Sequence, residues 1–363
     1  MRKTALLVAG GTGGHLFPAL ALRAGLVERG WIVHMASDDR AGRFMEGVPS
    51  EECHVIASAT LAGGNPIAAL KTLATLARGL LAARKLLKAL KPDIVVGFGG
   101  YPTLPPVIAA RLGGIASIVQ DQNAVIGRAN RLLIRLGAHL ATGFENPAGS
   151  AAARAMTHVG NPVRPAVIAA SQRPYQAADA AGPFRLLVFG GSQGARTFSD
   201  LLPQAIAALT AQQRARLTIV QQCREEDLAR TRAAYGDLGI DNELAVFFTD
   251  MAERMAGAHL IVSRSGASTV SELAVIGRPA ILVPYPHALD HDQAENARAL
   301  AAAGGGWLMA EADLTPQILA GRLAGLMDDP AQLCAAAEAA RSLGTPQAVA
   351  RLADLVEKAA SGH

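Results

Sequence analysis

The sequence predicts an α/β protein made of two doubly wound halves, each built on a parallel sheet. Short apolar stretches alternate with helical patterns along all 363 residues, as expected for strands joined by helices. The chain is also longer than most single domains. In addition, three sequence patterns of the first half return in the same order in the second half. We therefore expect two domains of one design.

Each repeated pattern joins a predicted strand to a glycine turn or a polar loop. The three pairs are residues 2–20 with 184–202, residues 91–103 with 257–269, and residues 112–124 with 276–297. In open parallel sheets, ligands bind beyond the carboxyl ends of the strands. All of these turns and loops follow strands. We therefore expect them to line one cleft between the two halves.

The boundary between the halves is expected at the connector "GNPVRPAV", which Pro162 and Pro165 stiffen. This places the first domain at residues 1–164 and starts the second at residue 165. Near the end of the chain, "TPQAVARLADLVEKAAS" predicts a helix with Thr345 as N-cap and Pro346 at its first position.

Charge is distributed unevenly between the two halves. Residues 1–164 contain 18 Lys and Arg against 9 Asp and Glu, whereas residues 165–363 contain 16 against 21. This asymmetry indicates that the first half meets an anionic surface. Aromatic residues make up only 4% of the chain, so stacking against nucleic acid is not expected.

A basic segment between residues 53 and 92 contains no acidic residue. Its residues Lys71, Arg78 and Lys85 are spaced seven apart, so they share one face of a predicted helix that is also rich in leucine. Such a helix can lie on anionic phospholipid. The alternative is a solvated basic face on a helix whose leucines belong to the core.

Other features exclude several classes of protein. No uncharged apolar run free of Gly and Pro approaches the ~20 residues of a membrane span. Arg2 and Lys3 precede only five apolar residues, which favours a buried first strand over a signal peptide. The cysteines are odd in number and scattered, which is typical of a reducing compartment.

The first glycine turn, "GGTGGH", ends in His15. Leu16 stands where a dinucleotide-binding fingerprint has its last glycine, although Asp38 and Asp39 keep a dehydrogenase-type ribose site open. No turn is followed by a Walker lysine, which argues against ATP hydrolysis. A helix N-terminus disfavours the imidazolium form, and a neutral imidazole can accept a proton from a sugar hydroxyl. An ordinary packing role for His15 remains the alternative.

A second motif, "SRSGASTVSELA", gathers hydroxyl side chains around a predicted helix start. Hydroxyls and free backbone N–H groups there suit an anion such as a diphosphate. Glu272 cannot favour that anion, so it is a candidate for holding two ribose hydroxyls. A helix-stabilising glutamate is the alternative.

Taken together, these motifs closely resemble the MurG family, the bacterial N-acetylglucosaminyltransferases that convert lipid I to lipid II in peptidoglycan synthesis. The matching segments follow the family's order essentially from end to end: "GGTGGHLFPAL", "GFGGYPT", "GNPVR", "GGSQGAR", "RSGASTVSELA" and "HDQAENA". The resemblance implies the GT-B fold, with two facing Rossmann-like domains and a deep cleft between them. Residues 1–164 would be the acceptor and membrane-facing domain, residues 165–342 the UDP-GlcNAc-binding domain, and residues 343–363 a helix that packs back on the first.

The resemblance also implies partners and a location. UDP-GlcNAc and lipid I would be the substrates, and neither a cofactor nor a metal is expected. The protein would lie at the cytoplasmic face of the bacterial inner membrane as a peripheral protein. Other cell-wall synthesis or division proteins are further possible partners, and nucleic acid is not.

Site residues are implied by position. His15 would be the general base. Asp121, where the family usually has Glu, would be a second catalytic candidate whose side chain is one methylene shorter. The residues implied in substrate binding are Thr12, Gly13 and Gly14 near both substrates; Gly99, Gly100 and Tyr101 at the acceptor diphosphate; Asn123 at the GlcNAc; Arg164 and Ser192 at the UDP end; Phe248 at the uracil; Ala267, Ser268, Thr269, Val270, Ser271 and Glu272 at the diphosphate and ribose; and Gln293 at the donor sugar.

The expected reaction is an inverting, metal-independent transfer. The 4-hydroxyl of MurNAc would attack the anomeric carbon of UDP-GlcNAc while His15 takes its proton. Helix N-termini and Arg164 would stabilise the charge that grows on the departing UDP. Two alternatives stay open: a GT-B transferase for another lipid or natural-product acceptor, and a noncatalytic protein that binds a nucleotide sugar or dinucleotide.

Overall fold

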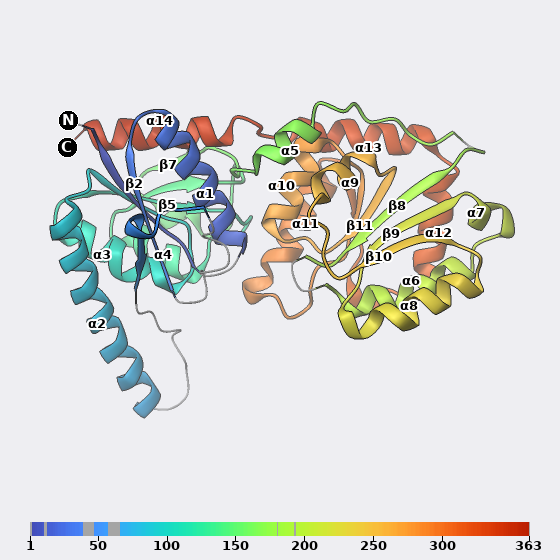
Figure 1. Ribbon diagram of the computed structural model, residues 1–363, viewed down its shortest axis with the longest axis horizontal. Coiled ribbons are helices and arrows are strands. Elements are labelled where there is room, and N and C mark those ends of the chain that lie inside the picture. The colour runs from blue at the N-terminus through green and yellow to red at the C-terminus, as the bar shows by residue number, and fades with distance from the viewer. Residues whose placement is uncertain are drawn as a thin grey trace. The chain divides into compact units, whose positions relative to one another are not determined.

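The computed structural model describes residues 2–10, 13–38, 47–56, 66–179, 181–191 and 194–362. The chain divides into two compact units (Figure 1). Unit 1 comprises Met1–Arg164 together with Pro346–His363, and unit 2 comprises Pro165–Thr345. The chain thus leaves unit 1 at the Pro-flanked connector. It returns three residues beyond the sequence-based boundary at residue 342.

Unit 1 is built on a parallel sheet that has seven strands in the described part of the chain, in the order β3-β2-β1-β4-β5-β6-β7. The strands are β1 (Thr4–Val8), β2 (Ile32–Ser37), β3 (Cys53–Val55), β4 (Ile94–Gly97), β5 (Ala116–Asp121), β6 (His139–Thr142) and β7 (Met156–His158). The helices are α1 (Gly13–Glu28), α2 (Pro66–Leu90), α3 (Leu104–Leu112), α4 (Arg128–Arg135) and α14 (Ala348–Ser361).

Strand β1 shows why this sheet is covered on both faces. Its alternate residues Ala5 and Leu7 are fully buried in a core with α1 and α14, whereas Leu6 and Val8 are fully buried in a second core beneath α2, α3 and α4. Successive side chains of a strand point to opposite faces. A continuous apolar run is therefore the expected sequence of a strand buried on both sides.

Unit 2 repeats the design with six parallel strands, counted over the described residues, in the order β10-β9-β8-β11-β12-β13. The strands are β8 (Phe184–Phe189), β9 (Leu217–Gln222), β10 (Asp241–Ala245), β11 (Leu260–Ser263), β12 (Ala280–Leu282) and β13 (Gly306–Leu308). The helices are α5 (Pro165–Ala170), α6 (Arg196–Ala207), α7 (Ala211–Ala215), α8 (Glu225–Asp237), α9 (Met251–Gly257), α10 (Ala267–Ile276), α11 (Asp292–Ala302), α12 (Pro316–Met327) and α13 (Pro330–Ser342).

Both sheets change direction of winding at their centre. In unit 1 the change falls between β1 and β4, and in unit 2 between β8 and β11. Open parallel sheets form their ligand crevice at this position, beyond the carboxyl ends of the two strands. The predicted pair of doubly wound sheets is therefore confirmed, and the glycine turns of the sequence follow the four strands that flank the two crevices.

The last helix, α14, completes the core of unit 1. Its Leu352 and Val356 are fully buried together with residues of α1 and β1. The backbones approach so closely that a β-carbon on Gly25 would lie 2.8 Å from a methyl carbon of Val349. The two ends of the chain consequently lie side by side, and Lys3 Nζ donates a 2.7 Å hydrogen bond to Ser361 Oγ (Figure 1).

The prediction that Thr345 caps this helix is wrong. Helix α14 begins at Ala348, and Gln347 occupies the N-cap position. The chain first crosses the backbone of α10, where a β-carbon on Gly344 would lie 2.7 Å from the carbonyl oxygen of Ala274. Because this close crossing fixes the backbone just before residue 345, the helix starts only after the turn that follows.

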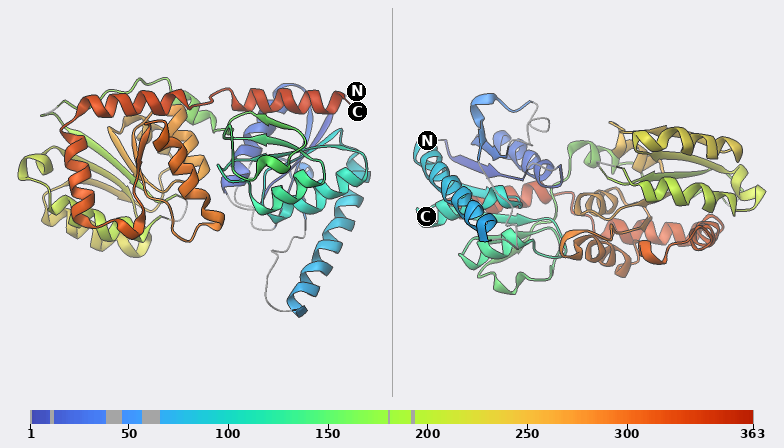
Figure 2. Two further views of the ribbon diagram at one scale, coloured as in Figure 1. Left: turned by 180° about the vertical axis from the view of Figure 1, so that it is seen from behind. Right: turned by 90° about the horizontal axis from the view of Figure 1, so that it is seen from below.

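Helix α2 projects from unit 1 past the edge of its sheet (Figures 1 and 2). Arg78 and Lys85 are exposed, and Leu81 between them is 67% exposed on the same face. The side chain of Lys71 lies outside the described residues. Within the described residues, no helix has the length and apolar character that crossing a membrane requires.

Candidate active site

The crevice of unit 1 holds the imidazole of His15 against two glycines. His15 lies in the first turn of α1, and a β-carbon on Gly10 would be 3.1 Å from its Nδ1. From the other side, a β-carbon on Gly99 would be 3.1 Å from Cδ2 and 3.2 Å from Nε2. These distances are shorter than ordinary van der Waals contacts. A β-carbon at either position would therefore press on the ring and displace it by a few tenths of an ångström.

The turns that follow β1 and β4 are themselves joined. Gly10 N donates a 3.1 Å hydrogen bond to Gly99 O, and a β-carbon on Gly100 would lie 3.2 Å from Gly10 Cα. Gly99 and Gly100 both have positive φ angles, +94° and +79°, which glycine adopts without strain. Tyr101 then begins a short 3₁₀ helix (Tyr101–Thr103), in which Thr103 Oγ1 donates to Gly100 O at 2.7 Å. The predicted acceptor turn is thus fixed by its own backbone.

Asp121 lies at the end of β5 and is only 2% exposed. Its Oδ1 accepts from Asn123 N at 3.1 Å, and its Oδ2 accepts from Gly127 N at 2.8 Å and from Asn130 Nδ2 at 2.9 Å. Burial raises the pKa of this carboxyl, and the three hydrogen bonds act in the opposite direction. The carboxylate therefore holds the loop that carries Asn123 and ties it to α4.

Asn130 on α4 connects this loop to the histidine turn. It is 2% exposed, and its Nδ2 lies 3.7 Å from the position that a β-carbon on Gly99 would take. Gly99 thus lies between the imidazole of His15 and the amide that donates to Asp121. Within the described residues, Asn130 Oδ1 is a buried acceptor with no hydrogen-bond partner.

The first turn of α1 also positions an arginine. The ring of Phe17 lies beneath Gly13, where a β-carbon would be 3.0 Å from the ring, whereas Gly14 has open space at the equivalent position. The guanidinium of Arg164, the last residue of unit 1 before unit 2, lies over the same ring at 5.5 Å from its centre. A cation held over an aromatic face in this way is favourably placed.

The crevice of unit 2 presents the N-terminal turns of α10. Gly266 is the N-cap, and the apolar residues Ala267 and Val270 are buried toward the core. The polar residues of the same turns are half-buried: Ser268, Thr269, Ser271 and Glu272. Orphan backbone N–H groups at a helix N-terminus favour an anion. The helix therefore offers N–H groups and hydroxyls to one side.

Gln293 is held from two directions at the start of α11. Its Oε1 accepts from Tyr285 N at 2.9 Å, and its carbonyl oxygen accepts from Ser265 Oγ at 2.8 Å. The fully buried Asn296 donates from Nδ2 to Ser265 O at 3.2 Å. The turn after β11 and the loop after β12 thus fix both the backbone and the side chain of Gln293.

Phe248 is 6% exposed, and the guanidinium of Arg254 lies 4.1 Å from the centre of its ring. Arg254 in turn donates to Glu243 at 2.6 and 2.8 Å and to Asp250 at 2.7 Å. A position whose side chain is fixed in this way can present its backbone to a ligand.

An Asp-x-Asp tripeptide, Asp290–Asp292, precedes Gln293. Two carboxylates at this spacing could share a cation, so this motif does not by itself favour a metal-free reaction. Asp292 Oδ1 accepts from Gln293 N at 2.7 Å, which makes it a helix-starting residue. Among the described residues, no group of three or more His, Cys, Asp or Glu side chains is arranged to hold a metal.

Comparisons with known proteins show which family this chain resembles. Residues 5–141 match the model of the glycosyltransferase family 28 N-terminal domain, and residues 185–356 match that of the family 28 C-terminal domain. The chain is 55% identical over 360 residues to a UDP-N-acetylglucosamine–N-acetylmuramyl-(pentapeptide) pyrophosphoryl-undecaprenol N-acetylglucosamine transferase of Mesorhizobium japonicum, covering 99% of this chain and 96% of that one. It is 52% identical over 357 residues to the transferase of the same name from Rhizobium etli, covering 98% and 96%.

A crystal structure of Acinetobacter baumannii MurG superposes with a TM-score of 0.80 at 30% sequence identity, covering 99% of this chain and 100% of that one.

The chain belongs to the MurG family.

It is therefore a glycosyltransferase, and its two Rossmann-like domains have the GT-B fold that the family resemblance implied. Most residues expected from the MurG-family motifs gather at the carboxyl ends of the central strands of their own unit. His15, Gly99 and Gly100 meet in unit 1, and in unit 2 Ser265, two residues before α10, donates to the carbonyl oxygen of Gln293. Thr12 and Ser192 lie outside the described residues.

The sequence motifs predict no role for two residues that lie at these crevices, Asn130 and Arg264. Asn130 carries no sequence signal beyond its position on a predicted helix. Arg264 stands inside the quoted motif "RSGASTVSELA", yet only its neighbours were assigned a role. Its burial, with 8% of its surface exposed at the end of β11, is what distinguishes it.

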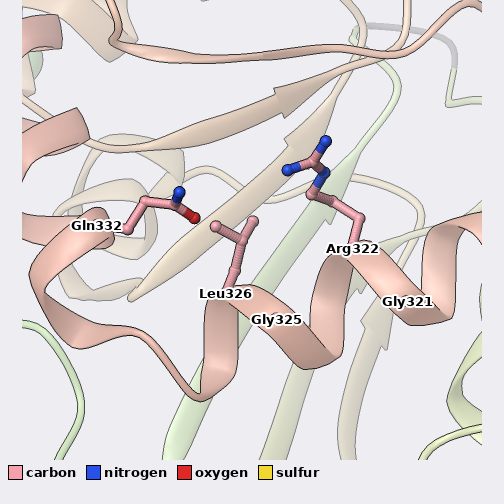
Figure 3. Close-up of a pocket in the computed structure, with 5 residues that line it drawn as sticks. All are labelled: Gly321, Arg322, Gly325, Leu326 and Gln332. Atoms are coloured by element: carbon pink, nitrogen blue, oxygen red, sulfur yellow. The ribbon is translucent and has the colours of Figure 1, made fainter.

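A surface cavity of about 300 Å³ lies elsewhere in unit 2 (Figure 3). Arg322 and Leu326 reach it from α12, and Gln332 reaches it from the start of α13. None of the MurG-family site residues lines it, so we assign it no part in the reaction.

Proposed function

We propose that this chain transfers GlcNAc from UDP-GlcNAc to the 4-hydroxyl of MurNAc in undecaprenyl-pyrophosphoryl-MurNAc-pentapeptide, with inversion at the anomeric carbon. The names of its relatives at 52–55% identity state this donor and this acceptor, and the match covers nearly the whole of each chain. The observation that carries the proposal in the structure is the His15 imidazole, which is fixed at the unit 1 crevice by the two glycine turns.

His15 is the general base of this proposal. Its ring lies against glycine backbone rather than among bulky side chains, and the residue is half-buried. In the proposed step, an imidazole nitrogen takes the proton of the attacking hydroxyl as the new glycosidic bond forms and the bond to UDP breaks. A positioned base of this kind contributes ~10²–10⁴-fold to the rate.

We assign Asp121 a positioning role in this step. Three donors already occupy its two oxygens, and the side chain is almost fully buried. A carboxylate in that state is poorly placed to receive a proton from an acceptor sugar. Its hydrogen bonds instead fix the loop of Asn123, which we propose contacts the GlcNAc. The shorter side chain here, compared with the usual glutamate, suits the closeness of Gly127 and Asn130.

Unit 2 would bind the donor. The N-terminal turns of α10, residues 267–272, would hold the diphosphate and ribose, with Glu272 on the ribose hydroxyls. Phe248 would present its backbone to the uracil, and Gln293 would hold the donor sugar. Arg164 and Ser192 would act at the UDP end, and Gly13, Gly14 and Thr12 close to both substrates. Helix N-terminal N–H groups stabilise the charge that develops on UDP as it leaves.

The acceptor would lie at the turn of Gly99, Gly100 and Tyr101, with its undecaprenyl chain in a membrane. We place the peripheral attachment of this chain at the cytoplasmic face of the membrane. Helix α2 supports contact with an anionic lipid surface, because Leu81 is exposed between Arg78 and Lys85. Basic residues beside exposed apolar ones bind anionic lipid.

The deciding experiment is transfer of radiolabelled GlcNAc from UDP-GlcNAc to a lipid I analogue, in the presence of EDTA. A β-linked disaccharide product would support donor, acceptor, inversion and metal independence together. Product that forms only after Mg²⁺ is restored would contradict the proposal that the transfer needs no metal. Binding of UDP-GlcNAc without product on lipid I, but with product on another lipid acceptor, would contradict the proposed acceptor.

A further inference from the structure

Arg264 carries a positive charge to the carboxyl end of β11, beside the turn that we propose binds the diphosphate. A guanidinium at such a place could be an anion ligand. Its Nη1 group, however, is already engaged. Nη1 donates to Val283 O and Pro284 O, both at 3.1 Å, and the residue is 8% exposed. Nη1 is therefore not available to a phosphate without breaking these bonds.

Other contacts tie Arg264 to two more segments. It forms an ion pair with Glu311, which belongs to a 3₁₀ helix (Glu311–Asp313), and its Nη2 donates to Thr197 Oγ1 at 3.4 Å. Thr197, in the first turn of α6, donates from the same hydroxyl to Glu311 Oε1 at 3.0 Å. The guanidinium also lies over the rings of Phe198 and Tyr285, at 5.3 and 5.5 Å from their centres.

These contacts lead to Gln293. The two carbonyls that accept from Arg264, those of Val283 and Pro284, directly precede Tyr285, whose N–H donates to Gln293 Oε1 at 2.9 Å. Ser265, the next residue after Arg264, donates to Gln293 O at 2.8 Å. One arginine thus fixes the loop that orients the amide of Gln293, while its neighbour fixes the backbone.

We propose that Arg264 is a positioning residue for recognition of the donor sugar: it holds residues 283–285 so that Gln293 presents its amide to the GlcNAc. This inference rests on the proposed function of Gln293. It predicts a selective defect. Loss of the guanidinium should weaken binding of UDP-GlcNAc while binding of UDP, which lacks the sugar, stays nearly unchanged.

The test is calorimetric titration of UDP and of UDP-GlcNAc into wild type and Arg264→Lys, which keeps the charge but cannot span two carbonyls and a carboxylate. We expect the Kd for UDP-GlcNAc to rise about tenfold and the Kd for UDP to change by less than about twofold, as for loss of one or two positioned hydrogen bonds. Glu311→Gln, a milder change that keeps the shape, should show the same selectivity at roughly threefold. It replaces Arg264→Lys if that variant does not fold.

The matched control is Arg216→Lys. Arg216 is another buried guanidinium of unit 2 that donates to backbone carbonyls, of Gly182 and Asp179 at 2.8 Å. It precedes β9 and so lies at the amino end of the strands, whereas Arg264 follows β11 at their carboxyl end. Arg216→Lys should not raise the Kd for UDP-GlcNAc more than the Kd for UDP. A double variant supplies the coupling: Arg264→Lys should add little to the sugar-dependent loss of Gln293→Ala, because both act through the same amide.

The remaining outcomes would contradict either the positioning role of Arg264 or the proposed function. Equal losses for UDP and UDP-GlcNAc in Arg264→Lys, no loss for either, or full additivity with Gln293→Ala would overturn the positioning role. Failure of the wild type itself to bind UDP-GlcNAc would instead overturn the proposed function, whatever the variants do.

Discussion

The imidazole of His15 lies against the backbone of Gly99, on the side where every other residue type carries its β-carbon. The two come from different turns: His15 from α1 after β1, and Gly99 from the turn after β4. A β-carbon at Gly99 would be 3.1 Å from Cδ2 of the ring. The orientation of the proposed base therefore depends on the absence of one methyl group, 84 residues further along the chain.

Replacing Gly99 by alanine should lower kcat at least tenfold, because the new methyl group pushes the imidazole out of position. Gly99 has a φ of +94°, so the substitution also costs ~1–2 kcal/mol of backbone strain. Gly114→Ala is the matched control, since Gly114 has a φ of +73° and open space where its β-carbon would lie. Both variants should melt earlier, and only Gly99→Ala should lose turnover. Equal kcat in the two would contradict the link between the turn and the histidine.

His15→Ala should lower kcat by ~10²–10⁴-fold while the KM for UDP-GlcNAc changes little, because the proposed role is proton transfer. The measurement is steady-state kinetics on a lipid I analogue. His139→Ala is a suitable control, as His139 starts β6 at the opposite end of the strands and pairs with Thr157 Oγ1 at 2.9 Å. A variant that binds the donor poorly but turns over normally would show that His15 is a binding residue.

Asp121→Asn should lower both activity and stability without moving the acid limb of the pH–rate profile. In the variant, the NH₂ group of the amide would face N–H donors that contact a carboxylate oxygen in the wild type. An unsatisfied buried donor costs ~1–3 kcal/mol. Thermal unfolding and a pH series of kcat/KM would be measured together. If the acid limb disappeared while the melting temperature held, Asp121 would be a proton carrier and not a positioning residue.

His259 should make unit 2 less stable in mild acid. Burial, reinforced by Arg185, Arg173, Arg216 and Arg278, lowers its pKa from 6.5 to about 4. Between these two values the unfolded chain binds the extra proton and the folded one does not, so the free energy of unfolding falls as the pH falls. His259→Asn keeps an acceptor for Arg185 N, which donates to Nδ1 at 2.9 Å.

Urea unfolding at pH 7.5 and 4.5 would check this. The wild type should lose more stability than His259→Asn over that range, by a difference on the order of 3 kcal/mol at most. Comparison with the variant removes the contributions of other groups, including His54 and His139, whose pKa values burial also lowers. Parallel losses in the two proteins would show that His259 does not remain neutral in the fold.

Replacing Lys71, Arg78 and Lys85 by glutamine should lower the affinity for anionic phospholipid vesicles roughly a hundredfold at low salt, because each charge near the surface contributes ~1 kcal/mol. Sedimentation with the vesicles measures this affinity. Raising the salt should reduce the difference. A control that removes exposed charges elsewhere in unit 1, at Arg135 and Lys358, should bind almost as the wild type does. Unchanged binding of the triple variant would exclude α2 as the membrane face.

The fold could be predicted because its signals are local and repeated. Apolar strands, glycine turns and the three paired segments fix the two sheets and the places where their strands end. The contacts between side chains within the site could not be predicted from the sequence. Asn130 donates to Asp121 only because α4 packs beside β5, and Arg264 reaches Glu311 across 47 residues of sequence. Neither contact has a spacing that a sequence pattern can reveal, since tertiary packing decides it.

The prediction of the N-cap of the last helix was wrong for the same reason. Thr345 followed by proline is a good N-cap on local grounds, but the crossing of Gly344 over α10 decides where the chain can begin to coil. A local preference of ~1 kcal/mol yields to such a steric contact.

The return of α14 to unit 1 has a consequence for biosynthesis. Leu352, Ala353 and Val356 complete a core that β1 and α1 begin, so the first-made half of the chain cannot close that core until all of unit 2 has been translated. At about 5–20 residues per second, this leaves roughly 10–40 s during which an apolar face of the nascent unit stays uncovered on the ribosome. Unit 2 is one continuous segment and can fold meanwhile. The half that would meet the membrane is thus the last to mature.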